Sequence, residues 1–273
     1  KLIWPLIIEQ LLTVLVGMMD TIMVASVGEA GVSAVSLVDS IMILIIQIFA
    51  AIATGGAVVA GQFLGAKDED NACSAANQLV LFIAVLSVGV MALVYLLRGF
   101  ILHQVFGQIS PEVMAYCSTY LDIVSLSIPF IALYNGGAAL FRTMGNSKIS
   151  MYTSLLMNAI NVVGNAILIY GFKMEVAGAA IPTLFSRIVA AVVMIALLRN
   201  PKLLVHLKRP FALRFNGGLI KRILYIGVPN GLENSMFQLG RVLLVSMIST
   251  FGTAQIAANA VANNIDAFGI LPA

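Results

Sequence analysis

The chain has 273 residues, of which 60% are hydrophobic and only 10% are charged, and its formal net charge is +3. Soluble domains carry about a quarter charged residues, so this chain cannot cover itself with a water-facing surface and is predicted to be an all-α protein that crosses a membrane many times. The small net charge without a basic run argues against nucleic acid as a partner. The two distant cysteines, Cys73 and Cys117, indicate neither a disulfide framework nor a metal site.

Apolar stretches long enough to cross a bilayer, which takes about 20 residues, recur along the chain. In chain order the expected spans are 2–26, 34–64, 73–97, 113–141, 147–171, 177–198, 219–249 and a stretch from 254 that is incomplete. Gly55-Gly56 and Pro129 are the expected bend points within spans. Because the chain opens at Lys1 and stops inside an apolar stretch, we expect it to be a piece of a longer protein.

The segment 199–218 differs from the other links because it is long, basic and partly amphipathic. It is predicted to lie on the membrane surface between two bundles. The expected organisation is therefore a six-helix lobe over 1–198, a cytoplasmic basic linker over 199–218 and the start of a second, truncated lobe over 219–273.

The distribution of lysine and arginine predicts the orientation. Ten of these residues lie in or near links after even-numbered spans, and only Arg98 and Lys173 follow odd-numbered spans. Cytoplasmic loops carry the excess of basic residues. We therefore expect a multi-pass protein of the plasma (inner) membrane with a cytoplasmic N-terminus and a cytoplasmic linker.

An internal repeat becomes visible when each residue is compared with the one 224 positions later. Pro5 then meets Pro229, Glu9 meets Glu233, and Gly28 meets Gly252, without a gap. Six spans separate the two copies, so both have the same orientation. Such copies are related by an axis along the membrane normal, which is one of the repeat schemes of secondary transporters. The predicted parent protein has twelve helices in two pseudo-symmetric lobes.

Several polar residues lie inside the expected spans. In the first span Glu9, Thr13, Gly17 and Asp20 share one helical face. A carboxylate in the middle of a bilayer costs about 2.5–3.5 kcal/mol and normally faces a bundle interior or a wet cavity. We therefore expect functional roles for Asp20 and for Glu233 of the seventh span, whereas Glu9 could also lie at the cytoplasmic edge.

Later spans add further polar stripes. The fifth span carries Ser154, Asn158, Asn161 and Asn165 on one face; the sixth carries Thr183 and Arg187, and the seventh Asn230, Asn234, Gln238 and Arg241. Such residues also join helices by hydrogen bonds, which is an equal alternative for Asn158 and Gln238. For Arg187 we expect a carboxylate partner or a position at the membrane edge rather than substrate contact. Asp39 and Asp122, near the outer ends of their spans, are expected to face water.

The stretch PLIIEQLLTVLVGMMDTIMVASVGEAGVSAVSLVDSI resembles the first two helices of the multidrug and toxic compound extrusion (MATE) transporters. Further segments extend the resemblance over essentially the whole chain: GGAVVAGQFLGAKD, FRTMGNSK, NAINVVGNAILIYG, GAAIPTLFSR and GVPNGLENSMF. The family's two-lobe, twelve-helix fold agrees with the internal repeat.

The resemblance implies secondary active efflux of organic cations or amphipathic drugs, coupled by antiport to inward flow of H⁺ or Na⁺. It assigns the cation site of the first lobe to Asp20, Asn161, Asn165 and Thr183, and an acidic site of the second lobe to Glu233. Many members carry a carboxylate where this chain has Asn165, which favours H⁺ over Na⁺ at Asp20. Glu9, Asn158, Arg187 and Gln238 are candidates for the substrate cavity or for secondary roles.

No hydrolase, zinc-enzyme or nucleotide-binding pattern is present, so we expect neither an enzyme nor a cofactor besides the coupling ion. The expected partners are small-molecule drugs and the lipid bilayer, and the expected state is a monomer. Two alternatives stay open. A lipid-linked oligosaccharide flippase of the related superfamily would need a more cationic cavity, and a membrane sensor would need no inward carboxylates on both lobes.

Overall fold

The structure, a computed structural model, describes residues 7, 11, 16, 17, 19, 20, 22–106, 109–208 and 215–249. Within these residues the chain is built from helices and contains no strand. A helical run that ends at Ala25 precedes the labelled elements. These are α2 (Glu29–Gly65), α3 (Glu69–Leu96), α4 (Arg98–Phe100), the π-helical η1 (Ile101–Val105), α5 (Pro111–Ser125), α6 (Ile128–Thr143), α7 (Ser147–Asn165), the π-helical η2 (Ala166–Gly171), α8 (Ala177–Leu198) and α9 (Gly217–Ser249).

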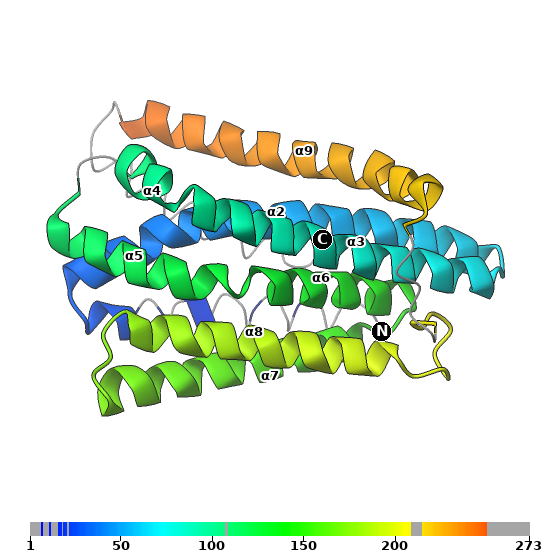
Figure 1. Ribbon diagram of the computed structural model, residues 1–273, viewed down its shortest axis with the longest axis horizontal. Helices are drawn as coiled ribbons and strands as arrows, with labels where there is room; N and C mark the ends of the chain where they lie inside the picture. Colours follow the sequence, from blue (N-terminus) through cyan, green and yellow to red (C-terminus); the bar gives the residue numbers. More distant parts are fainter. Residues whose placement is uncertain are drawn as a thin grey trace.

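The long helices form an elongated bundle. In Figure 1, α9 lies along one long side and α7 and α8 lie along the opposite side. The long helix α2 packs against α9, α6, α3 and α5, and it contributes the fully buried side chains of Met42 and Phe49 to the core. We call the end of the bundle where α8 finishes and α9 begins the linker end. The opposite end, where α2 and α8 begin, is the cavity end.

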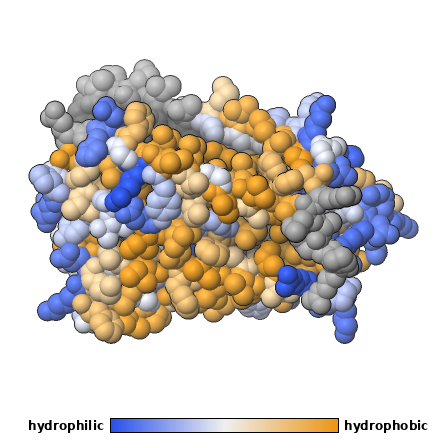
Figure 2. All heavy atoms as spheres, viewed as in Figure 1, coloured by the Kyte–Doolittle hydropathy of each residue, from blue (hydrophilic) through white to orange (hydrophobic). Residues whose placement is uncertain are grey.

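The helices are long and apolar enough for the predicted membrane protein. Among the described residues α2, α3, the α7–η2 unit and α8 each could cross a bilayer, and the bent pair α5–α6 could form a fifth span. Figure 2 shows apolar side chains over the middle of the visible face and hydrophilic residues gathered at the two ends of the long axis. The expected span 219–249 is a single helix, α9, but it is not among the spans defined by composition, because polar residues such as Asn230 and Glu233 interrupt its apolar sequence.

One of the two expected bends coincides with a break between helices. The axes of α5 and α6 differ by 47° at the break around Ser127, and Pro129 lies in the first turn of α6. α2 continues as one helix through Gly55 and Gly56, so no break marks the bend expected there, which stays a prediction. These glycines allow close packing: a Cβ at Gly55 would lie 2.5 Å from the carbonyl oxygen of Ile223 in α9, and one at Gly56 would collide with Leu79 in α3.

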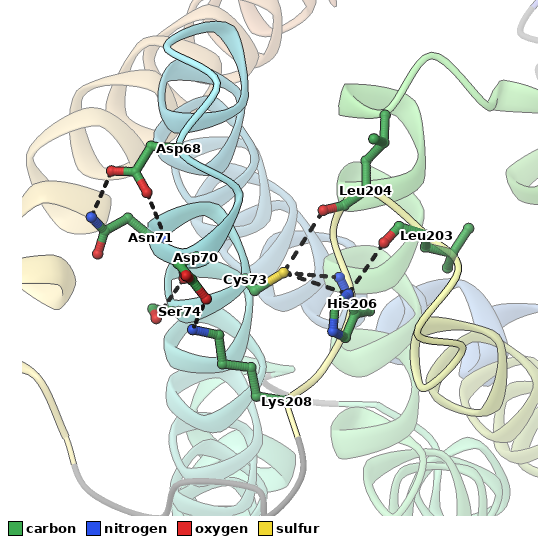
Figure 3. A network of polar contacts seen from close by, with 9 residues as sticks. All are labelled: Asp68, Asp70, Asn71, Cys73, Ser74, Leu203, Leu204, His206 and Lys208. Atoms are coloured by element: carbon green, nitrogen blue, oxygen red, sulfur yellow. Dashed lines mark hydrogen bonds and ion pairs between the residues drawn. The ribbon is translucent and has the colours of Figure 1, made fainter.

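The described part of the linker packs on the start of α3 (Figure 3). Val205 and Leu207 are buried, and the backbone N–H of His206 donates to Cys73 Sγ at 3.4 Å. Lys208 Nζ forms a salt bridge with Asp70 at 2.9 Å. The linker is therefore docked on the protein at least to Lys208, whereas residues 209–214 lie outside the described residues.

The turn that precedes α3 is stabilised locally. Asp68 caps α3 by accepting hydrogen bonds from the side chain and the backbone N–H of Asn71 (Figure 3). These hydrogen bonds, that of the Asn71 side chain above all, hold the pKa of Asp68 below its usual value. Asp68 therefore stays ionised as the N-cap of α3, where negative charge favours the helix terminus.

Candidate cation site

A cavity of about 340 Å³ opens at the cavity end of the bundle. Its wall is formed by the helical residues that precede α2 and by α2, α5, α7 and α8. Apolar side chains such as Val24 and Val35 alternate with polar ones, namely Asp20, Ser36, Asp39, Ser40, Tyr120, Asn165 and Thr183. This is the mixed lining, apolar with a few convergent polar groups, that is typical of small-ligand sites.

The four residues expected to form the cation site of the first lobe lie together. Asn165 Nδ2 donates to Asp20 Oδ1 at 2.7 Å, and the Asn161 amide lies between Asp20 and Thr183. Asn161 and Asn165 are buried, while Asp20 is half-buried at the cavity wall. The helical spacing predicted that Asn161 and Asn165 share a face, and the structure adds that this face meets Asp20.

The neighbours of the Asn161 amide can be considered with either orientation of its oxygen and nitrogen, and the second orientation below satisfies both atoms. In one, Asn161 Nδ2 donates to Thr183 Oγ1 at 2.9 Å, and the Thr183 hydroxyl donates to the carbonyl of Ala179 at 2.9 Å. In the other, Asn161 Nδ2 donates to the two carboxylate oxygens of Asp20 at 2.9 and 3.0 Å, and its oxygen accepts from Thr183. The second orientation suits an ionised Asp20, because a carboxylate can only accept hydrogen bonds. The charge of Asp20 is thereby linked to the hydrogen bond of Thr183.

A close approach of α7 and α8 holds these residues at hydrogen-bond distance. A Cβ at Gly164 would lie 2.6 Å from Cβ of Pro182, so only glycine allows the two helices to meet there. Gly164 directly precedes Asn165, and Pro182 directly precedes Thr183. The π-helical turn η2 then begins at Ala166. Sequence reasoning missed this contact, although a glycine and a proline next to the expected site residues are signals that could have found it.

Two amide groups of α7 are left with unpaired atoms. Asn165 Oδ1 is buried and has no hydrogen-bond partner among the described residues, and the same holds for Asn158 Nδ2. An unpaired buried polar atom costs about 1–3 kcal/mol. A cation or a hydrogen-bond donor would therefore be stabilising at Asn165 Oδ1, whereas Asn158 Nδ2 needs an acceptor. Asn165 Oδ1 has the chemistry of a cation ligand and belongs to the cavity lining, whereas Asn158 is not part of that lining.

The structure brings a further carboxylate to the cavity. Asp39 of α2 was expected to face water, but it is half-buried in the cavity wall and accepts a hydrogen bond from the buried Tyr120 at 3.3 Å. Arg187 of α8 donates to Ser127 Oγ at 2.7 Å and interacts electrostatically with Asp39 and Tyr120. No salt bridge joins Arg187 to a carboxylate among the described residues, so its expected carboxylate partner stays a prediction. Asp122, in contrast, pairs with Arg98 at 2.7 Å near the surface.

The remaining sequence candidates lie elsewhere. Glu233 is exposed on α9 and does not line the cavity of Asp20. Glu9 lies outside the described residues, and so does the side chain of Gln238. Their roles, like the binding of a cation at Asp20, stay predictions.

The chain was compared with known protein families, curated proteins and solved structures. Residues 5–167 match the family model named MatE. The chain is 28% identical over 277 residues to an uncharacterized transporter of Bacillus subtilis, YisQ, with 99% of this chain and 60% of that protein covered. It is 25% identical to the multidrug export protein MepA of Staphylococcus saprophyticus, with 93% and 56% covered.

A crystal structure described as MATE in the bent conformation has the same fold. It superposes with a TM-score of 0.90 at 24% sequence identity and covers 99% of this chain and 60% of that one. The chain therefore spans about 60% of the length of the first of these relatives and of this structure.

Proposed function

Because the chain belongs to the MatE family of transporters, we propose that it supplies the first lobe and the start of the second lobe of a secondary multidrug exporter. The transported compounds would be organic cations or amphipathic drugs, and their export would be driven by antiport against H⁺ or Na⁺. One observation carries this proposal: Asp20 meets Asn161, Asn165 and Thr183 at the wall of a cavity inside the helical bundle.

The proposed mechanism starts from an ionised Asp20. The amide of Asn165, and that of Asn161 in one of its orientations, donate to the carboxylate and hold it in place. When H⁺ or Na⁺ binds, the carboxylate no longer needs two donors, and the Asn161 amide can return its nitrogen to Thr183. The helix that carries Asp20 would then repack against α7 and α8, which changes the access of drug to the cavity between the lobes.

The basic residues support the proposed orientation in the membrane. Lys67 follows α2, Lys148 lies in the first turn of α7 and Lys208 follows α8, so all three lie at the linker end. Because cytoplasmic loops carry the excess of basic residues, we propose that the linker end faces the cytoplasm and the cavity end faces the outer side of the plasma membrane. The cation would thus enter from outside, as an antiporter that uses an inward gradient requires. We propose that the transporter acts as a monomer.

An Asp20→Asn variant tests the proposal in the intact transporter. In proteoliposomes loaded with ethidium, we expect the wild type to extrude dye when a Na⁺ gradient or a H⁺ gradient is imposed, each applied separately. Asp20→Asn keeps the shape of the side chain but cannot lose a proton or neutralise Na⁺, so gradient-driven efflux should fall at least about tenfold.

Asp122→Asn is the matched control, because Asp122 pairs with Arg98 near the surface and does not line the cavity. We expect this variant to extrude ethidium at the wild-type rate. Efflux by Asp20→Asn at the wild-type rate would show that Asp20 is not the coupling residue. Absence of efflux from the wild type under both gradients would contradict the proposed function itself.

A further inference from the structure

Asp39 faces the same cavity as Asp20 from a different helix. Asp20 precedes α2, whereas Asp39 lies inside α2, and both carboxylates line the cavity and repel each other electrostatically. Tyr120 of α5, which is only 5% exposed, donates its hydroxyl proton to Asp39 Oδ1 at 3.3 Å. Asp39 is thus held in the cavity wall by a buried donor, and it makes a second negative charge available to any cation inside.

Arg187 places one positive charge behind this wall. Its guanidinium donates to Ser127 Oγ at 2.7 Å, and the Ser127 hydroxyl in turn donates to the carbonyl of Val124 at 2.6 Å. Ser127 is fully buried at the break between α5 and α6. Arg187 is therefore fixed on the α5–α6 break; it is not part of the cavity lining, but it lies one helical turn after Thr183 of α8, which is.

We propose that Asp39 is a second cation-attracting carboxylate of the cavity. We further propose that Arg187 limits the net charge of the cavity to a single negative charge, which one monovalent cation balances. Two carboxylates and one guanidinium sum to a single negative charge when both acids are ionised. Asp39 of α2 thereby replaces the carboxylate that is missing at Asn165 of α7, at a position that the polar stripe of α7 did not predict. This inference rests on the proposed cation-coupled transport.

No other described side chain of the cavity lining carries a formal charge. α2 contributes Asp39, α5 contributes the weakly acidic Tyr120, and α7 and α8 contribute only the neutral Asn165, Ala179 and Thr183. α3, α6 and α9, which also pack against α2, contribute no residue to the lining. The charge seen by an ion in the cavity is therefore set by Asp20, Asp39 and Arg187.

A charge-compensation experiment tests the inference in the intact transporter. The quantity measured is the half-saturating concentration of the coupling ion, H⁺ or Na⁺, for ethidium efflux from proteoliposomes. Asp39→Asn removes one negative charge, so this concentration should rise about tenfold, since a unit charge acting across a protein cavity changes ion affinity by about one order of magnitude. Arg187→Gln should lower it by about the same factor.

The double variant Asp39→Asn/Arg187→Gln restores the single net negative charge. It should return the half-saturating concentration to within about threefold of the wild type. A merely structural role of the two residues would not restore the wild-type value, because removing the second side chain does not repair the packing that was lost with the first. Asp122→Asn, the surface control, should stay within about twofold of the wild type.

The outcome separates this inference from the proposed function. If the wild type and Asp20→Asn behave as proposed but Asp39→Asn leaves the half-saturating concentration within about twofold, the inference is wrong and the proposed function stands. Double-variant values further from the wild type than either single variant would also overturn it. Should Arg187→Gln fail to accumulate in the membrane, the tenfold effect of Asp39→Asn alone decides, since the asparagine can still accept from Tyr120.

Discussion

At its cavity end α2 presents Asp39 to a polar cavity, whereas at its linker end the same helix presents Gly55 to the backbone of α9. The cavity end contains buried groups with a choice of partners, such as the Asn161 amide, and one with none, Asn165 Oδ1. The contact of α2 with α9 leaves no such freedom, because Gly227 approaches the carbonyl oxygen of Ala51 so closely that a Cβ there would lie at 3.0 Å. One end can respond to an ion and the other holds two helices in a fixed contact.

This difference predicts that small changes act differently at the two ends. Added volume at the linker end should separate α2 from α9, which is the first helix of the expected second lobe. Added volume or charge at the cavity end should change the response to the coupling ion more than it changes stability.

We expect the largest effect from Gly55→Ala. The new methyl group would lie 2.5 Å from the carbonyl oxygen of Ile223 and 2.7 Å from the backbone nitrogen of Gly227. Neither is a flexible side chain, so α9 must move, which should cost about 1–3 kcal/mol. We expect a lower Tm of the purified transporter in detergent, together with loss of ethidium efflux.

Gly89→Ala in α3 is the matched control, because a Cβ at Gly89 meets nothing within 4 Å. Alanine favours a helix over glycine by up to about 1 kcal/mol, so this variant should keep or slightly raise the Tm. If Gly55→Ala and Gly89→Ala have the same Tm and the same efflux, the close contact between α2 and α9 does not hold the linker end together.

A smaller and different effect is expected from Gly164→Ala at the cavity end. The methyl group would meet the ring of Pro182 at 2.6 Å and push α7 away from α8. The hydrogen bond between Asn161 and Thr183 would then lengthen, so the half-saturating concentration of the coupling ion should rise several-fold. The Tm should fall less than for Gly55→Ala, since the contact involves one proline side chain rather than the backbone of a neighbouring helix.

The efflux assay and a melting curve on the same preparation check this expectation, and Gly89→Ala is again the matched control. A fall in Tm as large as that of Gly55→Ala, without a change in ion response, would show that the Gly164–Pro182 contact serves stability rather than the ion site.

The sequence predicted the residues of the expected cation site better than it predicted the contacts between them. Helical spacing placed Asn161 and Asn165 on one face, and the resemblance to a known family added Asp20 and Thr183; the structure brings all four together. Spacing along one helix cannot show which side chain of another helix faces it. For that reason the partnership of Asp39 with Tyr120 was missed, and a carboxylate near the end of a span was interpreted as facing water.

The glycines show the same limit in the apolar part of the fold. A Gly-Gly pair within a span is compatible with a bend and equally with close packing, because both follow from the missing side chain. Only the position of α9 shows that Gly55 lies in a close helix contact. The expected spans from 34 to 198 were predictable from length and hydropathy, because α2, α3, the α5–α6 pair, the α7–η2 unit and α8 are long and apolar enough to cross a bilayer.

The smallest effect is expected from Asp70→Asn, which removes the salt bridge to Lys208 at the linker end. The Asp70 side chain is 94% exposed, and exposed salt bridges contribute about 0–1 kcal/mol. We expect a change in Tm that is hard to distinguish from zero. The change should be smaller still in 1 M NaCl, where the attraction between the two charges is screened. Val205 and Leu207 are buried nearby and should keep the linker docked without the ion pair. A fall in Tm as large as that of Gly55→Ala, seen at low salt but absent in 1 M NaCl, would contradict this expectation. It would mean that charge rather than packing stabilises the linker end, and the contrast drawn between the two ends of α2 would be wrong.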